Sequence, residues 1–141
     1  LMASLPLMRI EEIQFDYFEA IAHTQGVAAA AAALQEWVNT NRYTDGSYTC
    51  NATTMDDFID ALMIQRRIEL WGEGLVLFDY KRLNLPVTRK YSGTNYASSV
   101  QLNSYDGYVA PWMNYMIPET EKDHNPAVIV GPNPSGAITA E

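Results

Sequence analysis

The stretch Ile64–Asn84, IQRRIELWGEGLVLFDYKRLN, decides the fold of this 141-residue chain, because it places charge inside an apolar helical pattern. Its charged residues alternate with leucines and aromatic residues, and they are Arg66, Arg67, Glu69, Glu73, Asp79, Lys81 and Arg82. Charged side chains are seldom buried in a helix unless they are paired. Two interpretations follow: these side chains carry out chemistry, or they hold helices together through ion pairs.

The residues before this stretch predict a helical hairpin. In the segment 7–23 apolar residues recur every three or four positions, at Ile10, Ile13, Tyr17 and Ile21. This spacing predicts an amphipathic helix with that stripe, widened by Phe18 and Ala20, as its apolar face. The run AAAAAALQEWV has very high helix propensity and predicts a second helix over 27–39. Gly26, between them, suits a helix C-terminus, so the two helices are expected to form an antiparallel pair.

The quoted stretch itself belongs to a second hairpin. A polar loop, TNRYTDGSYTCNATT, separates it from the first. Thr53 or Thr54 is expected to cap a helix over 55–71 with Phe58 inward. Two glycines then interrupt the pattern, and a shorter helix is predicted over 75–83.

Two helix pairs at comparable spacing predict an all-α fold built from tetratricopeptide-like (TPR-like) helix pairs. We expect the two hairpins to occupy residues 7–84 of a single domain. From residue 85 to residue 141 proline, glycine, asparagine, serine and tyrosine are frequent, and no helical period persists. A long irregular, loop-rich segment is therefore predicted there, which packs over the helices or serves a function.

Composition excludes several classes of function. The formal net charge is −8 and the sequence pI is about 4.6, so the chain is expected to repel nucleic acids. Cys50 is the only cysteine, which rules out an intrachain disulfide and a four-thiolate zinc site. No apolar run reaches the roughly 18 residues that a transmembrane helix needs. We expect no metal and no cofactor.

Glu69 and Glu73 are the most suggestive carboxylates for catalysis. They lie four residues apart and share a helix face, and a retaining glycosidase holds two carboxyl groups about 5–5.5 Å apart. Such a pair must flank a substrate in a cleft, however. Neighbouring basic residues favour ion pairing instead: Arg66 can reach Glu69 at i+3, and Arg82 or Lys81 can fold back from the next helix. We therefore expect no catalytic residue and interpret six charged residues as structural ion pairs: Arg66, Arg67, Glu69, Glu73, Asp79 and Arg82.

The loop-rich segment contains an unusual set of aromatic residues. They lie among asparagine, serine and aspartate, and they are Tyr91, Tyr96, Tyr105, Tyr108, Trp112 and Tyr115. Aromatic faces beside amide and hydroxyl groups suit sugar rings, which stack through their C–H faces and hydrogen-bond through their hydroxyls. The alternative is that these side chains simply cover the helices. We take the six residues as candidate ligand contacts.

Three segments together resemble the SusD/RagB family. The quoted stretch is similar to that family's signature helix pair at Arg66, Arg67, Glu69, Leu70, Glu73, Gly74, Phe78, Asp79 and Arg82. The tail YMIPETEKDHNPAVIVGPNP resembles the family's terminal pattern at Pro118, Glu121, Asn125, Pro126, Asn133 and Pro134. RIEEIQFDYFEAIAH is similar to the family helix that precedes an Ala-rich helix.

The resemblance implies a non-enzymatic lipoprotein on the surface of the Bacteroidetes outer membrane. Such a protein captures glycans, or in some members other nutrients, and caps a SusC-like TonB-dependent transporter. Family members are longer, so this chain is expected to be the C-terminal part of one, and its lipid anchor is expected outside this sequence. The family's ligand contacts lie in variable loops, and none transfers to a particular residue here.

Two rival functions stay open on the sequence. A TPR-like adaptor would bind only protein and no small ligand. A glycoside hydrolase would use Glu69 and Glu73 as its two carboxylates.

Overall fold

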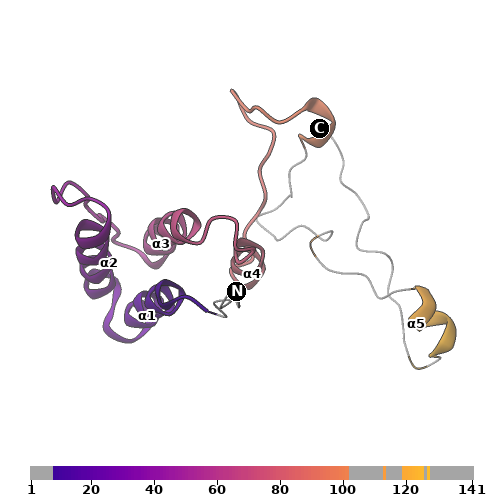
Figure 1. Ribbon diagram of the computed structural model, residues 1–141, viewed down its shortest axis with the longest axis horizontal. Coiled ribbons are helices and arrows are strands. Elements are labelled where there is room, and N and C mark those ends of the chain that lie inside the picture. Colours follow the sequence, from indigo (N-terminus) through magenta and orange to yellow (C-terminus); the bar gives the residue numbers. More distant parts are fainter. Residues whose placement is uncertain (1–7, 102–112, 114–118, 126, 128–141) are drawn as a thin grey trace, which may run out of the picture. The chain divides into compact units, whose positions relative to one another are not determined.

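A computed structural model describes residues 8–101, 113, 119–125 and 127 of the chain (Figure 1). Across these residues the regular structure is helical, and they contain no strand. The elements are α1 (Ile10–Gln25), α2 (Val27–Asn41), α3 (Met55–Glu69), α4 (Val76–Arg82), the 3-10 turn η1 (Ser98–Val100) and α5 (Glu119–His124). The predicted all-α fold with packed helix pairs is confirmed for this part of the chain.

The four predicted helices are α1 to α4, and their ends differ from the expected ones by no more than three residues. The cap of α3 is Thr54, one of the two expected residues. The Asp57 N–H donates to the Thr54 hydroxyl oxygen (3.2 Å), and the Thr54 N–H donates to the Asp57 carboxylate (3.0 Å). These reciprocal bonds form a capping box, which satisfies two donors that the start of a helix leaves unpaired.

Contacts divide the chain into two compact units, Leu1–Gly74 and Leu75–Glu141. The first contains α1, α2 and α3, and the second begins with α4. The expected pairing of α3 with α4, and the single domain that it implies, therefore stay predictions. In the segment expected to be irregular, η1 and α5 add two short helical elements that the sequence pattern did not indicate.

The core of the first unit lies where α1, α2 and α3 meet (Figure 1). Phe15 and Phe58 are fully buried, and Phe15 packs edge-on against Trp37 with 4.9 Å between ring centroids. The face of α2 toward this core is formed by Ala30, Ala31, Leu34 and Val38. Small alanine side chains let the phenylalanines of α1 come close to the backbone of α2, which explains why a helix so rich in alanine packs well.

The predicted helix α1 is confirmed, but its predicted apolar face is only partly right. Ile10, Ile13 and Tyr17 lie on the surface, and Ile10 is 69% exposed. Ile21 and Phe18 are buried as expected, together with Phe15 and Ala22. Both sets recur at helical spacing, so periodicity detects the helix without showing which stripe meets the core. The two phenylalanines are inward because the alanine face of α2 and the Trp37 ring leave room for large rings.

The loop between α2 and α3 reverses the chain along α2. The Asn39 side chain exchanges two hydrogen bonds with the backbone of Tyr48, both 3.0 Å. One turn earlier in α2, Gln35 accepts a bond from the Cys50 N–H, also at 3.0 Å. The loop therefore runs back toward the start of α2 before α3 begins. This return brings the last turn of α3 to the end of α2.

No helix in the described ranges is both long and apolar enough to cross a membrane.

The capping box gives a matched pair of substitutions. Thr54→Ala removes the hydroxyl that accepts from Asp57, so we expect the free energy of unfolding to fall by about 1 kcal/mol. Thr53→Ala removes only an exposed hydroxyl bond to Asp57, and we expect less than about 0.5 kcal/mol. Urea unfolding followed by circular dichroism measures both. Equal losses would show that Thr54 does not act as the cap.

Candidate functional site

Three helix ends meet at the carboxylate of Glu69, the last residue of α3. Arg9, just before α1, donates to one carboxylate oxygen, and Arg42, just after α2, donates to the other at 2.5 Å. Arg9 also donates to the Glu69 backbone carbonyl at 2.9 Å and to the Glu73 carboxylate at 2.7 Å. We call Arg9, Arg42, Glu69 and Glu73 the ion-pair network. It joins the start of α1 to the ends of α2 and α3.

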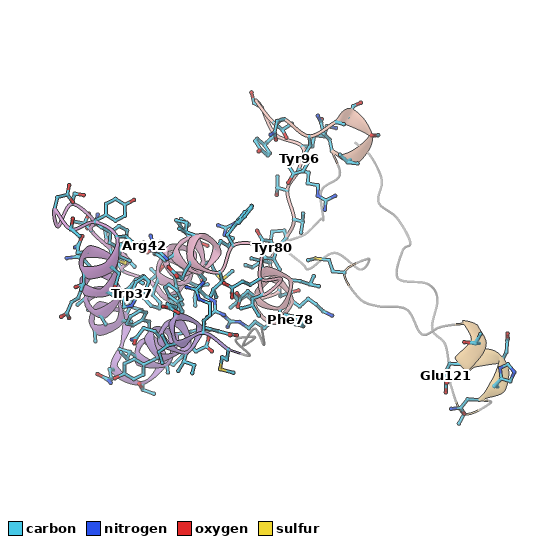
Figure 2. The ribbon with its side chains drawn as sticks, viewed as in Figure 1. Trp37, Arg42, Phe78, Tyr80, Tyr96 and Glu121 are labelled. Atoms are coloured by element: carbon cyan, nitrogen blue, oxygen red, sulfur yellow. The ribbon has the colours of Figure 1, made fainter. Side chains whose placement is uncertain are left out.

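Arg42 is the best-enclosed arginine of this network, with 16% of its side chain exposed. Its guanidinium lies 5.0 Å from the centre of the Trp37 ring, and both side chains are labelled in Figure 2. It also donates to the side-chain oxygen of Gln65 on α3. A planar guanidinium can contact a ring and form hydrogen bonds at the same time. Arg42 therefore links α2, through the Trp37 ring, to α3, through Gln65 and Glu69.

The hydrogen bonds of the network favour the charged forms of Glu69 and Arg9. Hydrogen bonding from Arg42, and secondarily from Arg9, lowers the pKa of Glu69 below its ordinary value. Hydrogen bonds to Glu73 and then Glu69 raise the pKa of Arg9. Each shift arises because the charged form accepts or donates bonds that the neutral form would lose.

This arrangement is poorly suited to glycoside hydrolysis. A retaining glycosidase needs one carboxyl group whose pKa is raised, so that it holds a proton to donate. The pKa of Glu69 is shifted the other way, and its two oxygens already accept from two arginines. Glu73 accepts from Arg9 as well. The geometry therefore favours a role in holding helices for these two carboxylates.

The remaining charged residues of the quoted stretch find other partners. Buried Arg66 donates to Asp16 on α1 at 2.6 Å, where the sequence suggested Glu69. Arg67 donates to the backbone carbonyl of Met63 at 3.2 Å, one turn earlier in α3. In the second unit, Arg82 donates to buried Asp79 at 2.8 Å within α4.

Sequence reasoning missed Arg9, Arg42 and Asp16. They lie 60, 27 and 50 residues from the charges that they bind. Local spacing carries no signal at such separations, because i+3 and i+4 rules describe neighbours on one helix only. The one available hint was position: Arg9 and Arg42 border the predicted helices, and ends of packed helices are where chain segments distant in sequence meet.

The described part of the aromatic segment is a hydrogen-bonded loop of residues 89–101, which we call the tyrosine loop. The Thr94 hydroxyl donates to the Arg89 carbonyl (2.9 Å), and the Gln101 side chain donates to the Tyr96 carbonyl (2.7 Å). Tyr91 and Tyr96 are 53% and 46% exposed, and Figure 2 labels Tyr96 at this loop. The loop thus presents two aromatic rings to solvent on a backbone that its own side chains tie together.

The guanidinium of Arg89 lies 5.8 Å from the centre of the Tyr96 ring, within the range of a cation–π contact. The other candidate ligand contacts, Tyr105, Tyr108, Trp112 and Tyr115, lie outside the described residues. In the ranges that are described, no three histidine, cysteine, aspartate or glutamate side chains gather to hold a metal ion.

The helical fold and the charged residues of the stretch 64–84 agree with one protein family. The SusD family model matches residues 2–140, and the chain belongs to the SusD family. Proteins of this family are generally nutrient- or glycan-binding proteins of the outer membrane, and they are generally not catalysts. No curated protein and no solved structure matches the chain at a significant level.

The ion-pair network predicts unequal effects for its two glutamates. Glu69→Gln places an amide donor against one of two arginines, so we expect the free energy of unfolding at pH 7 to fall by about 2–4 kcal/mol. Glu73→Gln affects a single bond at a more exposed position, and we expect less than about 1 kcal/mol. Urea denaturation of both variants tests this. If both variants lose a similar free energy of unfolding, Glu69 does not contribute more to the network than Glu73.

The pH dependence of stability should report on the same carboxylate. Because the folded pKa of Glu69 lies below its ordinary value of 4.5, its contribution is complete above that pH. The contribution is lost as the pH falls through the folded pKa. We expect the stability gap between the wild type and Glu69→Gln to narrow below pH 4.5, measured by urea unfolding at stepped pH. A gap that is constant down to about pH 2 would exclude this linkage.

Proposed function

We propose that this chain is part of a surface-exposed lipoprotein of the Bacteroidetes outer membrane that binds a glycan and delivers it to a SusC-like TonB-dependent transporter. The observation that carries the proposal is the SusD family match over residues 2–140. In this proposal the helices form a rigid support and perform no covalent chemistry. A lipid anchor makes the membrane contact in this proposal.

The tyrosine loop supports the ligand-binding part of the proposal. Tyr91 and Tyr96 expose aromatic faces on a loop braced by Thr94 and Gln101. A braced loop loses little conformational entropy on binding, so more of the stacking energy appears as affinity. Tyr105, Tyr108, Trp112 and Tyr115 extend the proposed contact set along the sequence. Binding functions commonly reside on such loops, while packed helices hold them in place.

One observation favours the alternative, a TPR-like adaptor that binds protein. The outer side of α3 and the residues after it expose Ile64, Ile68 and Trp71, and Trp71 is 85% exposed. These residues are spaced as one helical stripe, and contiguous exposed apolar side chains commonly mark protein contacts. A transporter partner would use such a surface equally well, so ligand binding is the property that separates the two functions.

Removing the exposed rings tests the proposed ligand contacts. We expect Tyr91→Ala and Tyr96→Ala each to weaken oligosaccharide binding by about three- to tenfold, because each removes a stacking face. Tyr17→Ala removes a similarly exposed tyrosine from α1 and should leave affinity unchanged. Isothermal titration with a panel of plant and host oligosaccharides measures binding. Tyr108→Ala and Trp112→Ala extend the test to the rest of the segment.

Two results would contradict the proposal. In the first, no oligosaccharide in the panel binds, but a protein partner binds and Trp71→Ala abolishes that binding. The chain would then be better described as a protein-binding adaptor. If binding occurs and none of the loop substitutions changes it, glycan capture stands and the proposed contacts are wrong. Co-purification of a large outer-membrane barrel protein with the full-length lipoprotein tests the transporter.

A further inference from the structure

One face of α3 is exposed along the length of the helix. Leu62, on the opposite face, is fully buried in the core. On the outer face Asp60, Ile64 and Ile68 recur every four residues, and each of them is exposed. Trp71 follows at the next helical step, just after the helix ends, and is 85% exposed. We call Asp60, Ile64, Ile68 and Trp71 the outer stripe.

The outer stripe has two chemically different halves. Its first half is acidic, because Asp60 follows Asp56 and Asp57 of the first turn, and all three aspartates are exposed. Residues 55–65 contain these three aspartates and no basic residue. The second half is apolar and consists of the two isoleucines and the tryptophan. Arg67 lies at the edge of this second half, two turns after Asp60, and donates to the Met63 carbonyl at 3.2 Å.

The apolar half has the character of a contact surface. Two isoleucines and an indole in contact with water forgo about 25 cal/mol for each square ångström of apolar surface that a partner would cover. Contiguous exposed apolar side chains of this kind commonly mark protein contacts. The chemistry of the occupant then depends on the charges around the stripe.

Charge disfavours a second copy of the chain as that occupant. The unit Leu1–Gly74 contains four basic and eleven acidic residues, a formal charge of −7. Two such units repel each other, and an anionic lipid surface is repelled in the same way. A partner that brings positive charge is instead attracted, and its cations can lie against the acidic half of the stripe.

We infer that the outer stripe binds a cationic amphipathic segment of a partner protein. Apolar side chains of that segment cover Ile64, Ile68 and Trp71, and its lysines or arginines lie against the acidic half. An amphipathic helix that lays its apolar face on a complementary surface is a common form of peptide recognition. This inference goes beyond the proposed function and does not depend on glycan binding.

Three synthetic peptides of equal length and without tryptophan test the required chemistry. The first joins a lysine-rich half to a leucine-rich half. The second replaces its lysines by glutamates, and the third replaces its leucines by serines. Each is made in both sequence directions, so that it can lie along α3 either way. We expect the first peptide to bind the chain at least about tenfold more tightly than the other two, and to weaken as salt rises.

Two measurements follow this binding. Isothermal titration gives the affinities. The fluorescence of Trp71, taken as the difference between the wild type and Trp71→Phe, shows whether the indole is covered. Because this ring is exposed in the free chain, we expect its emission to move to shorter wavelength when the first peptide binds.

Matched substitutions assign the binding to the outer stripe. We expect Trp71→Ala to weaken it about tenfold, whereas Tyr17→Ala removes another exposed ring, from α1, and should leave it unchanged. Asp60→Asn should weaken it severalfold, whereas Glu36→Gln removes an exposed carboxylate from α2 and should change it less than twofold. Circular dichroism and urea unfolding of each variant confirm that lost binding is not lost folding.

Several outcomes would overturn the inference. Equal affinity for the lysine and glutamate peptides, or equal losses in Asp60→Asn and Glu36→Gln, would remove the role of the acidic half. Peptide binding that Trp71→Ala leaves unchanged would place the contact elsewhere.

Other occupants of the stripe give different signals. Trp71 emission typical of a buried indole at every chain concentration would show that another part of the chain covers the stripe. Such emission appearing only as chain concentration rises would identify a second copy. A shift with phosphatidylcholine vesicles and none with the peptides would identify a lipid surface. Each of these results overturns the inference and leaves the oligosaccharide titrations unaffected, so this inference and the proposed function fail separately.

Discussion

The carboxylate of Glu69 is the constraint on which the helical unit depends. Its two oxygens bind Arg9 and Arg42, which border different helices, so one side chain determines where three helix ends meet. Enclosing charges in this way gains less stability than the attraction suggests, because each charge loses hydration. What it supplies is specificity: a shifted α3 would leave arginine and glutamate unpaired. The return of the loop along α2 makes this meeting geometrically feasible.

The described arginines form two kinds of contact. In the first unit Arg9, Arg42 and Arg66 are bonded to carboxylates and position helices. In the tyrosine loop Arg89 lies beside an exposed aromatic ring.

Much of the helical structure could be predicted because its determinants are local. Helical period, the alanine run and the Thr54 cap act within a few residues, and the helix ends were accordingly close to the observed ones. Expecting Ile10 and Tyr17 to face inward failed because periodicity alone does not show which stripe of α1 is buried, and the neighbouring stripe with Phe15 meets the core. Arg66 was expected to bind Glu69, but it donates to Asp16, which lies far away in sequence and close in space. For the candidate ligand contacts, composition indicated which six residues to consider, and all six still stand as predictions.

The sequence by itself determined the helices, their caps, the acidic balance and the signature charges that mark the SusD family, all of which are encoded in residue types at short spacing. Only the tertiary structure decided which stripe of α1 is buried, which arginines bind Glu69, and that Arg89 lies beside the ring of Tyr96. The physical reason is that ion pairs and packing depend on distance in space. The chain's reversal along α2 brings together residues that no local pattern relates.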